Sequence, residues 1–299
     1  MVRSAPPGLP NVRRCRNERW AVRVGGRIVF LKAATALGIV SVPVAATVIL
    51  PYKYSERVKL MATAVSEPVE ATTLPDSAQS LPGKGFTVTG IAPGPDGTWW
   101  ASNDGRTRMG DINRPSLVRL SASFDRILDE ITLPWRSSVQ GVTMADGDVY
   151  FSLLNERAIG KLNNGRPEIA YRVAYQPNGL SFDPTSNALI VSEYKSRRLR
   201  FYDLHTRHLV RQIDTLAEPD QLGVGNGALF YSSGDNGKPG TIFQLSLSTG
   251  RIENRWKMGQ ALAIEGVAIS GDNIIISDDS YFHQTRRPTN SIQRYAMGH

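Results

Sequence analysis

Residues 176–204, QPNGLSFDPTSNALIVSEYKSRRLRFYDL, contain three short apolar runs separated by polar, turn-forming residues. This order predicts three short antiparallel strands joined by tight turns. Asn178 begins the first predicted strand, and Ser192 closes the second. Asn178 alone is compatible with a turn residue or with one wall of a binding site, so its meaning depends on whether the stretch recurs.

The same pattern returns five times between residues 89 and 277. Each copy begins with a polar residue, which a glycine usually follows. An apolar triplet, a turn and a second apolar run that ends in serine come next. The copies are TGIAPGPDGTWWAS (89–102), QGVTMADGDVYFS (140–152), NGLSFDPTSNALIVS (178–192), DQLGVGNGALFYS (220–232) and EGVAISGDNIIIS (265–277). A third alternating strand follows every copy, and a fourth follows the first four. Repeats of four short strands every 40 to 50 residues are typical of propeller blades.

The sequence therefore predicts an all-β propeller of five four-stranded blades over residues 85–299. Six blades would need a copy that the sequence does not show. The fifth copy ends after three strands, so we expect residues within about 70–84 to supply its outer strand and close the ring. The rest of residues 51–84 is rich in Ala, Ser, Thr and Pro and is predicted to be a linker.

The N-terminal region has the pattern of a membrane anchor. Residues 28–50 form a 23-residue, largely apolar run, which is long enough to span a hydrocarbon core of ~30 Å as a helix. Seven arginines precede it, so the positive-inside rule predicts a cytoplasmic tail over residues 1–27 and a propeller outside the cytoplasm. A signal peptide cleaved near residues 45–47, followed by secretion, is the alternative. The single cysteine, Cys15, lies in the tail, so no disulfide is expected in the propeller.

The net charge of +8 comes from this N-terminal region. Residues 1–59 hold eleven Lys and Arg against two acidic residues, which leaves 24 basic and 25 acidic residues for the remainder. A nearly neutral propeller gives no reason to expect nucleic acid binding. The sequence does not indicate an oligomeric state.

The recurring polar positions predict a site in the central channel. The first strand of each blade lines the channel, so Thr89, Gln140, Asn178, Asp220 and Glu265 should ring one of its mouths. Converging oxygen ligands without Cys or His suit a hard cation, Ca²⁺ above all. Two carboxylates from adjacent blades, Asp220 and Glu265, would also repel one another unless a cation or proton lay between them. We expect Asn178, Asp220, Glu265 and Gln140 to be the metal ligands, with strand-start hydrogen bonding as the alternative role.

The loops after the second strands are predicted to form the rim of the same mouth. The expected rim residues are Asn103, Asn155, Glu193, Arg197, Arg198, Asp278 and Arg286, with Asp235 and Asp279 nearby. Each of these loops carries Lys or Arg, from Arg106, Arg108, Arg157, Lys195, Lys238 and Arg287 in addition to the rim arginines. A basic rim above an acidic floor would attract a small anionic or carbonyl-containing ligand, although solvated loop charges are an equal alternative.

Motifs for nucleophilic catalysis are absent from the sequence. It contains no G-x-S-x-G, H-E-x-x-H, P-loop or Cys/His metal spacing. Only His283 is predicted to overhang the mouth as a general base, and the recurring serines are expected to hydrogen-bond at strand ends. Candidate catalytic residues are therefore His283, Asp220 and Glu265.

The blade of residues 177–204 resembles the SMP-30/gluconolactonase and strictosidine-synthase-like propellers. GPDGTWWAS (94–102) is similar to streptogramin-lyase-like blades, and IEGVAISGDNIIISDDS (264–280) is similar to SdiA-regulated propellers. The lactonase resemblance implies a Ca²⁺-type ion at the channel mouth, held by Glu265, Asn178 and Asp220, with Gln140 in place of a further Asn. Two departures weaken this comparison, since the glutamate falls in the last copy and the chain has five copies where those enzymes have six blades. Two functions remain open: a metal-dependent hydrolase of small esters or lactones, and a non-enzymatic binding propeller at the cell envelope.

Overall fold

The computed structural model describes residues 13–15, 19–24, 27–32, 65–73, 87–105, 114–234, 236–280, 282–283 and 290–297. The chain divides into two compact units, Met1–Val58 and Lys59–His299. The second unit contains the propeller, and each unit is described separately below.

The first unit contains a three-stranded antiparallel sheet in the order β1-β2-β3. Its strands are β1 (Arg13–Cys15), β2 (Arg19–Val24) and β3 (Arg27–Lys32). The predicted membrane segment begins at residue 28, so its first five residues lie in β3, whereas residues 33–50 are outside the described part of the chain. Within that described part, no helix is long and apolar enough to cross a membrane.

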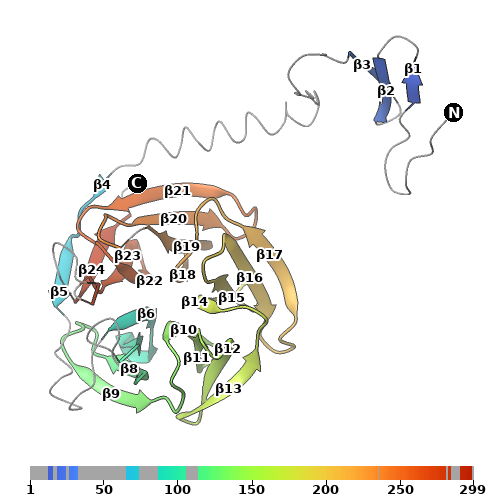
Figure 1. Ribbon diagram of the computed structural model, residues 1–299. Helices are drawn as coiled ribbons and strands as arrows, with labels where there is room; N and C mark the ends of the chain where they lie inside the picture. The colour runs from blue at the N-terminus through green and yellow to red at the C-terminus, as the bar shows by residue number, and fades with distance from the viewer. Residues whose placement is uncertain are drawn as a thin grey trace. The chain divides into compact units, whose positions relative to one another are not determined.

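The second unit confirms the prediction of a five-bladed all-β propeller. Viewed along the channel, the blades follow one another around a ring in chain order (Figure 1). The first blade consists of β6 (Val88–Pro93), β7 (Trp99–Asn103), β8 (Ser116–Leu120) and β9 (Ile127–Thr132), and the second of β10 (Val139–Ala145), β11 (Asp148–Leu153), β12 (Ala158–Asn163) and β13 (Arg166–Arg172). The third consists of β14 (Pro177–Asp183), β15 (Ala188–Glu193), β16 (Arg198–Asp203) and β17 (Leu209–Asp214), and the fourth of β18 (Leu222–Gly225), β19 (Ala228–Ser233), β20 (Thr241–Ser246) and β21 (Ile252–Met258). The fifth consists of β22 (Ile264–Ser270), β23 (Asn273–Asp278), β24 (Ser291–Ala296) and β5 (Glu70–Thr73). A short 3₁₀ turn, η2 (Pro95–Gly97), joins β6 to β7.

The N-terminal part of this unit closes the ring, as the three-stranded fifth copy predicts. Strand β5 pairs antiparallel with β24, in the register Ser291↔Thr73 to Arg294↔Glu70. The sequence does not predict a second contribution from the linker: β4 (Val65–Ser66) pairs in parallel with β21 and adds a fifth strand to the fourth blade. Residues 65–73 therefore bridge the outer edges of two adjacent blades.

The hydrophobic core lies between the blades. Five clusters of buried side chains are present, and each draws its members from two neighbouring blades. Strand alternation explains this arrangement, since successive side chains point to opposite faces of a sheet. Ala101 packs against the last blade, whereas its neighbour Trp100 packs against the second.

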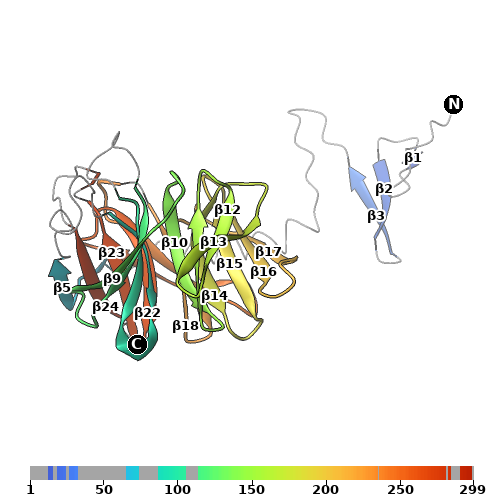
Figure 2. The ribbon, with the colours of Figure 1, turned by 90° about the horizontal axis from the view of Figure 1, so that it is seen from below.

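The recurring glycines allow the first strands to approach one another closely. A Cβ atom at Gly141 would lie 2.1 Å from the Leu180 nitrogen, and one at Gly179 would lie 2.3 Å from the Asp220 carbonyl oxygen. Glycine is the one residue that permits such a close backbone approach. Seen from the side, the strands run between the two faces of the ring (Figure 2).

Four of the five closing serines, all but Ser232, donate to the backbone of the next blade, which supports the expectation that they hydrogen-bond rather than act as nucleophiles. Ser192 Oγ accepts from Gly179 N at 2.7 Å within its own blade and donates to the Asp220 carbonyl of the next blade at 2.7 Å. Ser152 likewise accepts from Gly141 N and donates to the Asn178 carbonyl. These bonds fix the backbone at the positions where the polar channel residues begin.

Candidate functional site

The five recurring polar residues lie together at one mouth of the channel. Thr89, Gln140, Asn178, Asp220 and Glu265 all line a single cavity of about 370 Å³. This volume is at the lower end of the ~300–1,000 Å³ range of small-molecule sites. The other lining residues come from the adjoining loops and strand ends: Thr87, Asp104, Ser138, Leu154, Asn155, Tyr194, Asn236, Asp279, Phe282 and His283.

Carboxylates dominate this cavity. Asp104, Asp220, Glu265 and Asp279 all line it, and Asp104, Glu265 and Asp279 are buried. Among its described lining residues there is no lysine or arginine. The floor is therefore strongly acidic, as the sequence predicts for Asp220 and Glu265, with two further carboxylates.

His283 completes a compact group with two of these acids. Its Nε2 atom lies 3.1 Å from Glu265 Oε1 and 3.4 Å from Asp279 Oδ1. Glu265, Asp279 and His283 each offer one ligand atom, and these atoms lie within 4.8 Å of one another. Asn236 Nδ2 also contacts the imidazole, at 3.1 Å from His283 Nδ1 and 3.2 Å from Nε2.

Burial and mutual repulsion make Asp220 and Asp279 hard to ionise. Burial raises the pKa of Asp220 well above its ordinary value, and the charge of Glu265 raises it further, against the hydrogen bond from Asn178, which lowers it. Burial likewise raises the pKa of Asp279, with Glu265, Asp278, Asp220 and Asp104 adding to the effect. Strongly raised pKa values of this kind are characteristic of functional sites.

The amide residues of the ring have different environments. Asn178 Nδ2 donates to Asp220 Oδ1 at 2.6 Å, which leaves the Asn178 Oδ1 atom for a ligand. Gln140 Nε2 donates to Ser138 Oγ at 2.5 Å, and Ser138 Oγ donates to Asp104 Oδ1 at 2.8 Å. Thr89 is turned into the structure, where its hydroxyl bonds to the Val139 carbonyl.

The predicted rim residues are placed less regularly. Of the residues expected at this mouth that the structure describes, Asn155 and Asp279 line the cavity. Asn103 is buried and accepts from Thr87 N and Gly105 N, while Asp278 accepts from the backbone of Leu262, Ala263 and Ser280. Both residues therefore stabilise their loops.

The charged rim residues of the third blade interact mainly with one another. Glu193 pairs with Arg200 at 3.0 Å and with Arg198 at 3.5 Å, and Arg198 also approaches Asp214. Arg157, Lys195 and Arg197 are exposed, and Lys238 lies beside Asp220 and Asn236 in a small neighbouring pocket. Arg106, Arg108, Asp235, Arg286 and Arg287 lie outside the described residues.

Strand alternation explains which loop residues reach the cavity. The residue two positions after the recurring serine lines it in four blades: Asp104, Leu154, Tyr194 and Asp279. The residue directly after the serine, as in Asn103, Glu193 and Asp278, does not line it. The sequence places Asp279 at this mouth but not Asp104, which counting two residues from each serine would have added.

The donor set fits a divalent cation of the Ca²⁺ type. Ca²⁺ takes six to eight oxygen ligands from carboxylates, amide oxygens and water. The cavity offers four carboxylates together with the Asn178 and Asn155 amides. Both Asp279 carboxylate oxygens are buried and receive no hydrogen bond from the described residues, and the His283 contact at 3.4 Å is their closest ion pair. Such oxygens are costly to bury without a cation or proton.

Fold and site together define the chain as a five-bladed β-propeller with an acidic cavity at one mouth of its channel. No protein-family model matches the chain. No curated protein matches it either. Its structure is similar to glutaminyl cyclase of Myxococcus xanthus, with a TM-score of 0.56 and 12% identity over 78% of this chain and 97% of that one.

Two further structures are similar at a lower level. One is hydrazine synthase of Kuenenia stuttgartiensis, with a TM-score of 0.45 and 15% identity over 64% of this chain and 55% of that one. The other is a chain of the nidogen/laminin complex, with a TM-score of 0.46 and 16% identity over 66% of this chain and 73% of that one. At 12% identity, the similarity to glutaminyl cyclase shows the fold alone. It supports a propeller of the same general kind, and membership of the SMP-30/gluconolactonase group stays a prediction.

Proposed function

We propose that this protein is a metal-dependent hydrolase of small esters or lactones that acts at the acidic mouth of its propeller. The observation that carries the proposal is the group of buried Glu265 and Asp279 with half-buried His283, beside Asp220, in a cavity large enough for a small substrate. A carboxylate-rich site of this kind is unfavourable by itself and becomes favourable when a divalent cation binds.

The ring residues would hold the cation and position the substrate. Asp220, Glu265 and Asp279 would supply carboxylate ligands, and Asn178 and Gln140 would supply amide oxygens. A bound cation would polarise the substrate carbonyl and stabilise the oxyanion. His283 would carry a proton at Nε2, where Glu265 and Asp279 lie close enough to orient the ring.

The proposed location is the outer side of a membrane. The apolar run over residues 28–50 and the seven preceding arginines support a single anchor with its N-terminus in the cytoplasm. Alkaline extraction of membranes separates this arrangement from a cleaved signal peptide. An anchored chain stays in the pellet at full length, whereas a secreted one appears in the soluble fraction, shortened by about 45 residues.

The activity is tested with a panel of lactones and aryl esters on the full-length chain in mild detergent. Hydrolysis of γ-butyrolactone or p-nitrophenyl acetate is measured after EDTA treatment and after adding back Ca²⁺, Mg²⁺ or Mn²⁺. We expect one cation to restore turnover, and His283→Ala to lower turnover by ~10²-fold or more with the cation still bound. The matched control is Asp272→Asn, which removes an exposed carboxylate on the β22–β23 turn. Turnover that survives EDTA and His283→Ala alike would contradict the proposal.

A non-enzymatic binding propeller at the cell envelope is the second candidate. It is favoured by the environment of His283, which contacts Glu265, Asp279 and Asn236. A base so fully engaged has less freedom to serve a reaction. Binding of a divalent cation with no hydrolysis of any panel member would identify the site as a binding module.

A further inference from the structure

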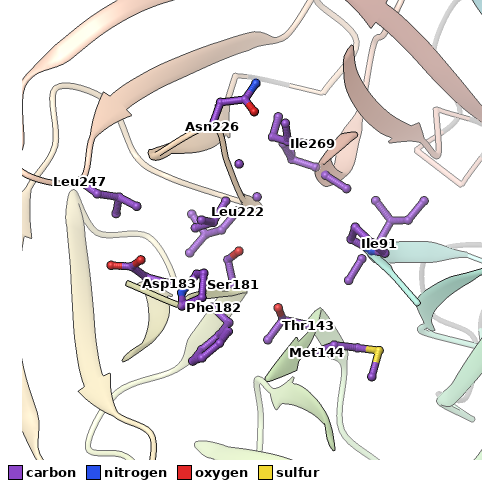
Figure 3. A pocket seen from close by; sticks show the side chains of 18 of the residues that line it. Ile91, Thr143, Met144, Ser181, Phe182, Asp183, Leu222, Asn226, Leu247 and Ile269 are labelled. Carbon is purple, nitrogen blue, oxygen red and sulfur yellow. The ribbon is translucent and has the colours of Figure 1, made fainter. Parts of the chain in front are cut away.

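The opposite end of the channel holds a second cavity, of about 320 Å³ (Figure 3). First strands from all five blades line it, through residues such as Ile91, Thr143, Ser181, Leu222 and Ile269. Asn178 in the acidic cavity and Ser181 in this one are three residues apart on β14, so the two cavities are separated by about 10 Å along the channel. Because different side chains line it, the second cavity is independent of the proposed hydrolase site.

The wall of this cavity is mainly apolar. Its aliphatic lining includes Ile91, Val142, Leu222, Val224, Val267 and Ile269. The volume equals that of about ten water molecules at ~30 Å³ each, and water against an aliphatic wall finds few hydrogen-bond partners. Displacing such water with apolar groups is favourable.

Two buried hydroxyls face into the cavity. Thr143 is 6% exposed and Ser181 is 5% exposed, and Figure 3 shows both hydroxyl oxygens directed toward the space between the strands. Neither hydroxyl makes a hydrogen bond within the part of the chain that the structure describes. Neither oxygen is among the fully buried side-chain atoms that lack a partner, so both are accessible from the cavity and available to a ligand.

The charge of the lining favours a neutral ligand. Asp183 is the one charged residue among the described lining residues. Its carboxylate accepts from Thr185 N at 2.9 Å and from Ser186 Oγ at 2.5 Å, so it stabilises the β14–β15 turn. An anion would be repelled by Asp183, and no second carboxylate lines the cavity to hold a cation.

We propose that this cavity is a binding site for a small, neutral, mainly apolar molecule with one hydroxyl group, such as a compact phenol or alcohol. The apolar part would fill the space between Ile91, Leu222 and Ile269. The hydroxyl group would bond to Thr143 Oγ1 and Ser181 Oγ.

The test compares two probes of nearly the same shape, p-cresol and toluene, by isothermal titration calorimetry of the full-length chain. All samples contain the same detergent, so partitioning into micelles is common to them. We expect saturable binding of p-cresol to the wild type and its loss in Thr143→Phe, which places a ring in the cavity. The double variant Thr143→Val/Ser181→Ala should weaken p-cresol about fivefold for each lost hydrogen bond and leave toluene unchanged.

Either of two results would overturn the proposal. One is the absence of saturable p-cresol binding to the wild type, and the other is binding that survives Thr143→Phe. If Thr143→Phe does not fold, the double variant decides, since an unchanged preference for p-cresol over toluene would equally contradict the site. Glu265→Gln should leave p-cresol binding intact, which separates this cavity from the acidic one.

Discussion

Replacing Asp220 with asparagine should stabilise the cation-free propeller. Asp220 lies in the acidic cavity with Glu265, and burial and the Glu265 charge both raise its pKa well above the ordinary value. The substitution Asp220→Asn removes the charge but keeps an oxygen that can accept from Asn178 Nδ2, at present 2.6 Å away. The geometry of the ring is thus kept while its repulsion is reduced.

The gain depends on pH in a defined direction. Because the folded pKa of Asp220 is raised, the folded protein binds the proton more tightly than the unfolded chain does, whose aspartates titrate near ~3.9. Wild-type stability therefore falls as pH rises from about 4 through the raised folded pKa, and is then constant. The difference between Asp220→Asn and the wild type should be absent below about pH 4 and largest at neutral pH.

Single stabilising substitutions commonly raise the free energy of unfolding by about 1–2 kcal/mol, and we expect Asp220→Asn to do the same. For a domain of this size the midpoint of thermal unfolding should rise by roughly 2–8 °C at neutral pH with EDTA present. Thermal unfolding of the full-length chain from pH 4 to 8 measures the effect, with the exposed Asp272→Asn as control. Equal stability of Asp220→Asn and the wild type across this range would refute the electrostatic account of the ring.

Three further predictions concern the ring and its chemistry. Ser192→Ala removes the hydroxyl that connects Gly179 N to the Asp220 carbonyl and should cost about 1–3 kcal/mol in urea unfolding, whereas Ser248→Ala, at an exposed position, should change little. Gly179→Ala places a Cβ atom 2.3 Å from the backbone carbonyl oxygen of Asp220 and should lower the free energy of unfolding by about 1–3 kcal/mol. Unchanged stability would show that the strands can separate freely. Cation binding should release protons and strengthen as pH rises, because the cation stabilises the ionised forms of Asp220 and Asp279; calorimetry in buffers of different ionisation enthalpy measures this, and the absence of proton release would contradict the raised pKa values.

Much of the fold could be predicted from the sequence because each blade repeats the same local pattern. The leading polar residue and the serine of each copy mark the two ends of a hairpin, and the number of copies matches the number of blades. The ring-closing strand β5 followed from the three-stranded fifth copy. The pairing of β4 with β21 could not be predicted, since two residues carry no detectable strand pattern.

The candidate site was predictable to a different degree on its two walls. The first strands all begin at the same height in the channel, so the sequence could place Asn178, Asp220 and Glu265 together. Placing the loop residues requires knowing which residue after each closing serine faces the cavity. Counting one residue from the serine selected Asn103 and Asp278, which bond to their own loops. The contacts of His283 with Glu265 and Asp279 bring together side chains that only the folded chain places side by side.

The most direct test of the central claim is divalent cation binding by the full-length chain. Thermal unfolding is measured with EDTA and with Ca²⁺, Mg²⁺ or Mn²⁺, for the wild type and for Asn178→Ala and Asp220→Ala. At a hundredfold excess over its dissociation constant, a bound cation stabilises the folded state by about 2.7 kcal/mol. We predict a clear rise in the unfolding midpoint of the wild type that Asn178→Ala reduces and Asp220→Ala abolishes. No shift of the wild type with any of the three cations would contradict a metal site at the channel mouth.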